Sequence, residues 1–387
     1  MQTKAKLSNR NTSMTRPTPP VRIGIIGCGN VLGAYLAVAD RLQKQGHAEV
    51  VALCGPEKHR RRVCEELRIP GFHPDPEQLI AREDIDLVVI LTPMPTHAPL
   101  ARAALQSSKH VLVEKPMAVT LEDGRDLVEL ARQSQGHLAC APFTILSPTF
   151  QAVAQRVRRG DVGRLVSARG RYGWAGPDWS DWFYKPGGGV LFDLGVYNLT
   201  TLTGWLGPVR RVTAMCGVAT PERVVQGRTV RVEAEDNAHA VLDFGGGCLA
   251  VITTGFNIQQ YRGPGIELYG TDGTINLLGD DWDPDGYEIW QNSAGCWQCF
   301  KETQPDWPWA DGLRHLVECI REGARPLVGP AHAFHVLEVM IKAQESGRDG
   351  RMRTLESTFT PPLFLEATPL EAAHRIHDRT RSPNDDW

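Results

Sequence analysis

The sequence contains no long apolar run and no marked excess of charge of either sign. A helix that spans a membrane needs about 18 consecutive apolar residues, which no segment of this chain supplies. Lysine and arginine number 42 against 45 aspartate and glutamate residues, so the formal net charge is −3. Because domains that bind nucleic acid usually carry a strong basic excess, these absences predict neither a membrane nor a nucleic-acid partner.

The first 20 residues lack both acidic side chains and an apolar stretch. A secretory signal peptide requires an apolar core of roughly 7–15 residues, so we interpret residues 1–20 as a disordered tail and expect a cytoplasmic protein. We interpret the charged residues 363–387 as a second tail. Cys296 and Cys299 form a close pair without a second pair at zinc-binding spacing, which is a weak metal signal. We therefore expect two ordinary cysteines in a hairpin and no metal site.

What the sequence does contain is abundant glycine and a regular alternation of elements in its first third. Apolar runs typical of buried strands occur at 21–26, 49–54, 86–91, 110–113 and 137–141. Helical spacing or helical composition occurs between them, at 31–42, 57–67, 98–105 and 121–132. Strands that alternate with helices in this way predict a doubly wound parallel sheet.

A glycine-rich turn joins the first strand to the first helix. Its glycines are Gly27, Gly29 and Gly33, and Asn30 and Val31 lie between them. In a Rossmann dinucleotide-binding unit, the first glycine permits the tight turn and the second lets the backbone approach a pyrophosphate at the helix N-terminus. The third glycine comes one position later than in G-x-G-x-x-G, but the strand–turn–helix context favours a bound dinucleotide over an empty turn.

The end of the second strand bears on the choice between NAD and NADP. An NAD site usually has an acidic residue there, which binds the ribose 2′-hydroxyl, whereas this chain has Gly55. Lys58, His59 or Arg60 could receive a 2′-phosphate; the alternative is that Glu57 serves the ribose of NAD. The pattern slightly favours NADP.

The loop after residue 91 adds three candidates to the same site. In a doubly wound sheet this loop lies beside the glycine-rich turn, across the crevice where the strand order reverses. We expect a cofactor in that crevice to touch Thr92 and Pro93. His97 either lines the crevice or caps the next helix.

Two further motifs indicate a family. Glu114-Lys115-Pro116 follows the strand at 110–113, and a glycine-rich segment leads into Asp193 and Tyr197. Together they resemble the motifs of the glucose–fructose oxidoreductase / inositol dehydrogenase / rhizopine-catabolism oxidoreductase family, over about residues 21–360. The resemblance implies an α/β fold, with an N-terminal Rossmann domain at 21–142 and a C-terminal α/β domain at 143–362 that has a large open, mostly antiparallel sheet. It also implies a homo-oligomer, a dimer or tetramer, because the open face of that sheet is often an interface in the family.

The residues of these motifs suit hydride transfer. Lys115 lies at the carboxyl edge of the sheet, where partial desolvation fits a lysine for proton transfer. Lys115 and Tyr197 are therefore the candidates to exchange the hydroxyl proton, and Asp193 would hold a substrate hydroxyl or orient Lys115. Glu114 would hold the lysine ammonium or touch the nicotinamide.

The chain departs from the family pattern at residues 197 and 200, and in residues 142–148, which lack an arginine often found there. Most members carry histidine where this chain has Tyr197, and the tyrosine form resembles the branch with glucose–fructose oxidoreductase and dihydrodiol dehydrogenase. Thr200 stands where an aspartate is usual. The ordinary pKa of tyrosine is far above that of histidine, so Tyr197 suits a proton donor or a relay assisted by Lys115. We expect substrate contacts that differ from those of the inositol enzymes.

The second half has longer strands separated by glycine and proline. They are expected at 165–172, 209–218, 238–244, 248–256, 265–269, 274–278 and 287–291, with helices near 150–157, 310–322 and 331–346. Residues 243–247 predict a hairpin turn. Trp182 and Tyr184, in the aromatic segment 174–184, are candidates to contact a sugar; the alternative is a packed loop or an oligomer contact. His332 and His335 are expected to be core or surface residues rather than metal ligands.

The leading hypothesis is an NAD(P)-dependent oxidoreductase that transfers hydride between a nicotinamide cofactor and a sugar, cyclitol or related polyol. One alternative is an NAD-retaining glycoside hydrolase that uses transient oxidation. The other is a non-catalytic sensor of cofactor or sugar, which has no need for the set formed by Lys115, Asp193 and Tyr197.

Overall fold

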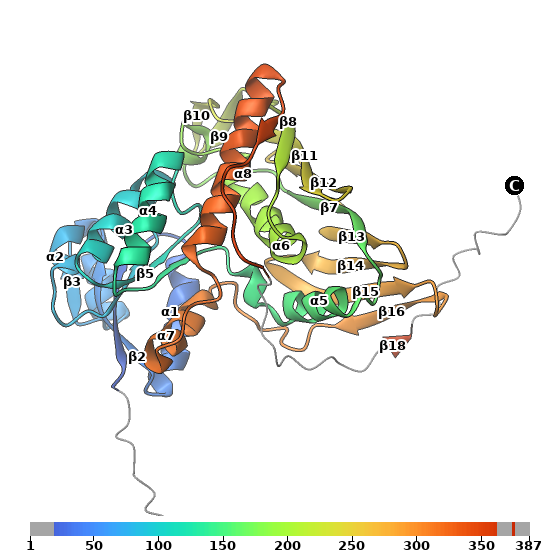
Figure 1. Cartoon of the computed structure of the whole chain (residues 1–387). Helices are drawn as coiled ribbons and strands as arrows, with labels where there is room; N and C mark the ends of the chain where they lie inside the picture. The colour runs from blue at the N-terminus through green and yellow to red at the C-terminus, as the bar shows by residue number, and fades with distance from the viewer. Residues whose placement is uncertain (1–18, 362–373, 376–387) are drawn as a thin grey trace, which may run out of the picture.

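The computed structural model describes residues 19–361 and 374–375, which form two sheets that lie side by side with helices between and around them (Figure 1). The tails expected at 1–20 and 363–387 fall almost entirely outside these residues. Two hydrophobic cores hold the fold together, and one of them extends through both sheets.

The first sheet is parallel throughout and has the strand order β3-β2-β1-β4-β5-β6. Its strands are β1 (Val21–Ile26), β2 (Ala48–Cys54), β3 (Gly71–His73), β4 (Leu87–Ile90), β5 (His110–Val113) and β6 (Leu138–Cys140). The order reverses between β1 and β4, and such a switch point is where ligands bind in doubly wound sheets. Every strand but β3 was predicted. β3 has a single apolar side chain, Phe72, which is too little for a periodic signal.

The helices of this sheet are α1 (Leu32–Lys44), α2 (Pro76–Ile80), α3 (His97–Gln106) and α4 (Leu121–Gln133). The helix expected at 57–67 is not regular: a 3₁₀ turn at Glu57–His59 is followed by a π turn at Arg62–Glu66. Val63 is the buried side chain of the π turn. With so little packing, nothing forces this charged segment into one continuous α-helix.

The second sheet is large, open and mostly antiparallel, in the order β17-β8-β11-β12-β7-β13-β14-β15-β16-β18. Its strands are β7 (Leu165–Gly173), β8 (Arg211–Gly217), β11 (Asn237–Gly245), β12 (Cys248–Gly255), β13 (Ile266–Gly270), β14 (Gly273–Asp280), β15 (Asp283–Gln291), β16 (Cys296–Lys301), β17 (Arg353–Thr354) and β18 (His374–Arg375). β7 and β12 pair in parallel. A separate hairpin joins β9 (Glu222–Val225) to β10 (Arg228–Arg231). The α/β fold expected from the resemblance is confirmed.

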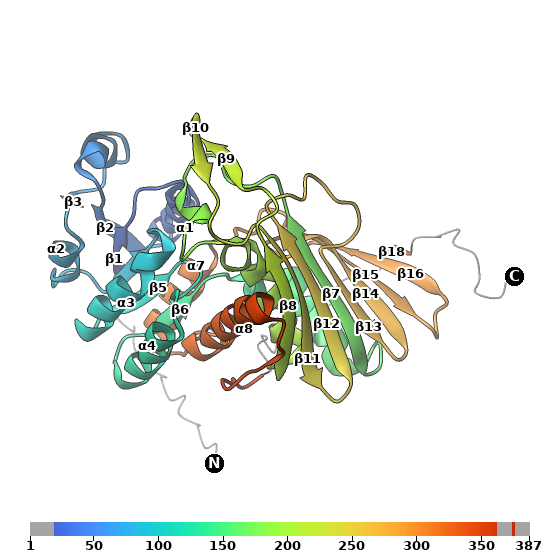
Figure 2. The same cartoon turned by 90° about the horizontal axis from the view of Figure 1, so that it is seen from above.

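Helices cover one face of this sheet and leave the other open (Figure 2). The covering helices are α5 (Pro148–Arg159), α6 (Val196–Leu206) and α8 (Pro330–Asp349), which contact β15, β7 and β8 respectively. α7 (Gly312–Glu322) instead returns to the first sheet and contacts α1, β1 and β5. The described part of the chain contains no helix long and apolar enough to cross a membrane.

Candidate active site

A cavity of about 520 Å³ opens between the two domains at the carboxyl edge of the parallel sheet. It brings together eleven of the sequence-predicted residues: Gly29, Asn30, Val31, Thr92, Pro93, His97, Glu114, Lys115, Trp182, Asp193 and Tyr197. Five others do not line it: Gly27, Gly33, Lys58, Arg60 and Tyr184. Cofactor, lysine and substrate motifs therefore face one space, whose volume is typical of a ligand site.

The glycine-rich turn is shaped to receive a dinucleotide. Gly27 has φ +117°, and a Cβ there would lie 2.6 Å from the Leu91 carbonyl oxygen, so the tight approach of β1 to β4 requires glycine. A Cβ on Gly29 would meet no protein atom within 4 Å, which leaves open space on the cavity side. α1 starts without a side-chain cap directly after this turn, and the positive end of its dipole favours a pyrophosphate there. These features fit the nicotinamide dinucleotide that the sequence predicts.

The end of β2 has a steric reason to lack an acidic residue. A Cβ on Gly55 would lie 2.6 Å from the Cys28 Sγ atom, so a cysteine side chain fills the place of an acidic group. Arg60 forms an ion pair with Glu57 and lies over the Phe72 ring. Lys58 is exposed and has no hydrogen-bond or ion-pair partner among the described residues.

Glu114 is held away from the Lys115 ammonium. One Glu114 carboxylate oxygen accepts a hydrogen bond of 2.7 Å from the buried Tyr35 hydroxyl. The other accepts one of 3.0 Å from the Lys115 backbone N–H. The expected contact of Glu114 with the ammonium is therefore wrong. Glu114 instead lines the cavity, which is the position that the other alternative, contact with a nicotinamide, requires.

His97 joins the two loops that flank the cavity. Its Nδ1 lies 2.7 Å from the Pro116 carbonyl oxygen, and its Nε2 lies 2.7 Å from that of Thr92. Burial lowers the pKa of this imidazole, while the two carbonyl contacts oppose that shift. The side chain reaches the cavity and also fixes the loop after β4 to the loop after β5, a role that neither sequence alternative included.

Lys115, Asp193 and Tyr197 form the polar centre of the cavity. The Lys115 Nζ donates hydrogen bonds of 2.6 Å to both the Asp193 Oδ1 and the Asp193 carbonyl oxygen. The same ammonium lies 4.9 Å from the centroid of the Tyr197 ring. Both members of the ion pair are only 11% exposed. An ammonium placed in this way can polarise or protonate a substrate oxygen.

The pKa of Tyr197 is raised well above its ordinary value by burial and by the nearby carboxylates of Glu114 and Asp193. Its hydroxyl has no hydrogen-bond partner in the described part of the chain. At neutral pH the group is therefore a protonated phenol, which suits donation to a substrate oxygen.

A carboxylate that the sequence did not single out supports this centre. Asp193 lies in a π turn, Leu191–Gly195, that leads into α6. The Leu191 backbone N–H donates to the Glu235 Oε1 at 3.3 Å, and a Cβ on Gly189, which has φ +102°, would lie 2.5 Å from the same oxygen. Glu235 thus anchors the start of the segment that carries Asp193. No local pattern marks it, because the contact spans more than 40 residues.

Aromatic side chains form most of the remaining wall. Besides Trp182, the cavity is lined by six rings that the sequence analysis did not assign: Tyr172, Trp174, Trp179, Phe183, Trp282 and Trp309. Tyr184 is buried instead and its hydroxyl donates to the Pro177 carbonyl oxygen at 2.6 Å. The aromatic segment was recognised in the sequence, but which of its rings reach the cavity depends on the turns between them.

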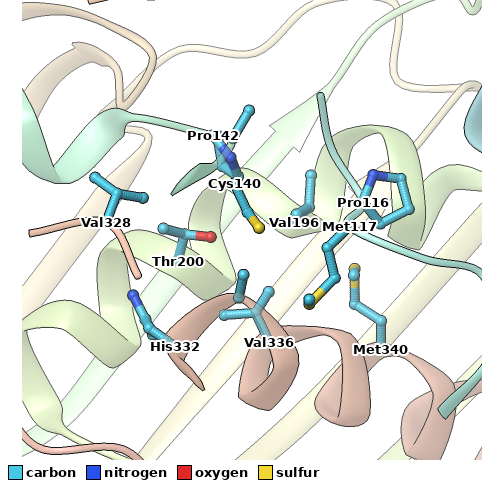
Figure 3. Close-up of a pocket in the computed structure, with 12 residues that line it drawn as sticks. Pro116, Met117, Cys140, Pro142, Val196, Thr200, Val328, His332, Val336 and Met340 are labelled. Carbon is cyan, nitrogen blue, oxygen red and sulfur yellow. The ribbon is translucent and has the colours of Figure 1, made fainter. Parts of the chain in front are cut away.

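Thr200 and the two histidines of α8 lie behind the site. Thr200 and His332 line a small cavity under Pro116, with Met117 and Cys140 (Figure 3). His332 is 3% exposed and its Nε2 lies 2.7 Å from the Thr203 hydroxyl, while His335 is fully buried. Both histidines are core residues, as expected. No group of residues in the described ranges could hold a metal ion.

Asp281 is a buried carboxyl group that contacts Asn198 of α6. Its Oδ2 accepts a hydrogen bond of 3.1 Å from the Asn198 side chain, whereas its Oδ1 has no partner. Burial raises the pKa of Asp281 to about 7. The folded protein therefore holds this proton more tightly than the unfolded chain does, and the stability that it contributes is present at low pH and is lost as pH rises through about 7.

Asp281→Asn is accordingly expected to stabilise the protein at high pH. The difference in unfolding free energy between the variant and the parent chain should be ~2 kcal/mol more favourable to the variant at pH 8 than at pH 5. The reason is that the parent chain must bury a charged carboxylate at pH 8, whereas the variant has no charge to bury. Urea denaturation at both pH values measures the difference. Asp283→Asn, which removes an exposed carboxylate from the same segment, is the control. An Asp281→Asn gain that is equal at pH 5 and pH 8 would contradict the prediction.

Comparison with known proteins supports this arrangement. Residues 21–141 match an oxidoreductase family with an NAD-binding Rossmann fold, and residues 150–276 match the GFO/IDH/MocA C-terminal domain. The chain is 29% identical over 320 residues to dTDP-3,4-didehydro-2,6-dideoxy-alpha-D-glucose 3-reductase of Streptomyces antibioticus, covering 79% of this chain and 90% of that protein. It is 24% identical over 347 residues to scyllo-inositol 2-dehydrogenase (NAD(+)) of Bacillus subtilis (strain 168), covering 85% and 95%.

A solved structure of levoglucosan dehydrogenase, in complex with NADH and levoglucosan, has the same fold. Its TM-score is 0.76 at 20% sequence identity, and the match covers 87% of this chain and 99% of that one. The family indicated by the Lys115 and Asp193 motifs is thereby confirmed. The chain belongs to the GFO/IDH/MocA family of NAD-binding oxidoreductases.

Proposed function

We propose that the protein interconverts a secondary alcohol and a ketone on a sugar, cyclitol or related polyol, with NADP(H) or NAD(H) as the hydride partner. The observation that carries the proposal is the Lys115 ammonium, held by Asp193 beside the Tyr197 ring in a cavity that also opens on the glycine-rich turn. The named relatives act on a dTDP-sugar and on an inositol, and both names describe carbohydrate or cyclitol oxidoreduction.

The residues divide into three groups by role. Lys115, Asp193 and Tyr197 are the proposed catalytic residues. The proposed cofactor contacts are Gly27, Gly29, Asn30, Val31, Gly33, Lys58, Arg60, Thr92, Pro93, His97 and Glu114. Of the two aromatic residues expected to contact substrate, Trp182 is kept, while Tyr184 packs beneath the loop.

The nicotinamide, when bound, exchanges a hydride with the carbinol carbon, and the protein must handle the matching proton. In the direction of reduction, the Tyr197 phenol donates its proton to the ketone oxygen, and the Lys115 ammonium stabilises the charge that develops there. Asp193 orients the ammonium through its carboxylate and its backbone carbonyl. In the direction of oxidation, Tyr197 first loses its proton to solvent, and the phenolate, stabilised by the Lys115 ammonium, then accepts the hydroxyl proton of the substrate.

A screen of sugars, cyclitols and their glycosides tests this function, with absorbance of the reduced cofactor as the readout. Glycoside cleavage is assayed separately in the same samples. Formation of a ketone with stoichiometric reduced cofactor supports the proposal. Cleavage without net cofactor change would indicate the cofactor-retaining hydrolase instead, and ligand binding without either reaction would indicate a sensor.

For the cofactor, we propose a preference for NADP(H) that depends on Lys58. This side chain is exposed and unpaired among the described residues, whereas Arg60 is engaged by Glu57. Titration of cofactor fluorescence should show tighter binding of NADPH than of NADH, and Lys58→Ala should weaken NADPH binding roughly fivefold, as expected for one exposed charge contact. Arg61→Ala, which removes another exposed charge, is the control. Tighter binding of NADH by the parent chain would overturn this interpretation.

We also propose that the protein is a cytoplasmic homo-oligomer that pairs through the open face of the large sheet. Val241 of β11 and Val251 of β12 are cross-strand partners, and Met215 of β8 pairs with His239, two positions from Val241 on the same face; the three are 46%, 41% and 81% exposed. Apolar side chains gathered on an uncovered sheet face are typical of an interface. Sedimentation equilibrium distinguishes a dimer or tetramer from the 42.7 kDa monomer.

A further inference from the structure

The aromatic wall of the cavity includes two groups of rings in contact with one another. Near the catalytic centre, the Tyr172 ring lies 5.7 Å from Tyr197 and 6.3 Å from Trp282. Toward the mouth, Trp174 and Trp179 stack with their centroids 5.5 Å apart. Tyr172 and Trp174 are two positions apart in one extended segment and so lie on the same side of it, which places the two groups in sequence along the cavity.

The outer group, Trp174 and Trp179, is held in place by hydrogen bonds from the β9–β10 hairpin to the backbone around it. The Arg223 guanidinium donates to the Ala175 carbonyl oxygen at 2.6 Å and to that of Phe256 at 2.8 Å. The Gln226 side chain donates to the Trp179 carbonyl oxygen at 2.7 Å. Because the backbone of this loop is fixed, its rings are positioned before any ligand arrives, which reduces the entropy lost on binding.

Close to Lys115, several hydrogen-bonding groups of the cavity are already used within the protein. Both nitrogens of His97, both carboxylate oxygens of Glu114 and the ammonium of Lys115 already have partners. The Tyr197 hydroxyl has no partner in the described ranges, nor do the side chains of Asn30 and Ser180, which line other parts of the cavity. At the reacting carbon, the Tyr197 hydroxyl and the Lys115 ammonium thus offer contacts for one or two oxygens.

Trp179 makes the mouth of the cavity apolar. It is 40% exposed, packs edge-on against Phe183 at 5.7 Å and stacks on Trp174. A large indole left partly in water at the entrance of a ligand site gains free energy when a flat apolar group covers it. The inner rings, Tyr172 and Trp282, lie beside Tyr197 and therefore contact the part of a ligand that reacts, not the flat group at the entrance.

We propose that the substrate has two parts: a hydroxylated ring, oxidised or reduced beside Lys115 and Tyr197, and a flat apolar substituent that stacks in the outer group with Trp174 and Trp179. The natural chemical class is a glycoside or cyclitol ether with an aryl or similar planar group, rather than a free polyol. This inference rests on the proposed function, since it names the substrate class of the same site.

Matched pairs of phenyl and methyl glycosides test the proposal. For the gluco, galacto and xylo series in both anomeric forms, calorimetric titration into the protein saturated with oxidised cofactor gives the ratio of the two dissociation constants. The phenyl member of the series that binds best should bind at least tenfold more tightly. Trp179→Ala should reduce this ratio severalfold, whereas Trp297→Ala, which removes an indole that contacts Trp290 away from the cavity, should preserve it.

The outcomes separate the two proposals. If phenyl and methyl members bind equally in every series, or if Trp179→Ala keeps the ratio, the two-part substrate is wrong, whatever the turnover. If the phenyl members bind more tightly and no compound reduces the cofactor, the proposed function fails and the subsite stands. A variant that loses thermal stability is replaced by Trp179→Leu, which keeps an apolar side chain without a flat face.

Discussion

Lys115→Ala is expected to lower kcat by about 10²–10⁴-fold, the range that a positioned proton-transfer group contributes. The Lys115 Nζ is the cation that the structure places against both Asp193 and the Tyr197 ring, so its removal leaves no positive charge at the substrate oxygen. Cofactor affinity should change little, because the glycine-rich turn, the proposed pyrophosphate site, has no hydrogen bond to this side chain. Steady-state kinetics and cofactor fluorescence titration measure the two effects.

Lys44→Ala is the matched control, since it removes an exposed lysine that pairs with Asp40 at 2.6 Å on the surface of α1. Lys115→Arg adds a second comparison, because it keeps the charge but changes the geometry of the donor. Turnover of Lys115→Ala within a few fold of the parent chain would show that Lys115 is not catalytic.

Asp193→Ala is expected to reduce both activity and stability. The Lys115–Asp193 pair is only 11% exposed on each side, and removing one partner of a buried pair costs ~3 kcal/mol of unfolding free energy because a buried charge remains. The kcat should fall by about 10²-fold or more, since the ammonium keeps only the backbone carbonyl of residue 193 to hold it. Urea denaturation and steady-state kinetics on the same preparation measure both effects.

A double-mutant cycle separates the ion pair from general damage to the π turn. Asp193→Ala combined with Lys115→Met removes both charges, so the double variant should be more stable than Asp193→Ala alone. Asp272→Ala, at a half-exposed carboxylate outside the cavity, serves as the control for loss of charge. Strict additivity of the two single-variant effects on stability would mean that the pair does not couple, contrary to the geometry.

The parallel sheet was predictable because its strands are buried on both faces and therefore appear as continuous apolar runs. β1 and β5 match their predicted bounds, β2 differs by one residue at one end, and β4 and β6 differ by one residue at each end. Two elements could not be predicted in this way. β3 is three residues long, and the charged segment 57–67 has too few buried side chains to make its helical turns regular.

The contact between Lys115 and Asp193 could be anticipated because both residues lie in local motifs, even though they are 78 positions apart. Residues without a motif were missed. Trp282 and Trp309 reach the cavity from segments about 100 residues beyond the recognised aromatic stretch, and Glu235 acts through a single backbone N–H. Tyr184 was included on composition, but a 3₁₀ turn directs its ring beneath the loop. Such contacts depend on the tertiary fold, which no local pattern encodes.

The return of α7 to the first sheet has a consequence for how this chain is made. Leu313, Leu316 and Val317 belong to the same core as the β1 residues Ile23 and Ile25, and Trp309 packs edge-on against Tyr35 at 5.7 Å. The surface of α1 that these residues cover is synthesised almost 300 residues earlier. During translation, this surface of α1 therefore stays uncovered until α7 has been synthesised. The core around β1 and α1 is thus completed only after the strands of the large sheet from β7 to β16 have been synthesised.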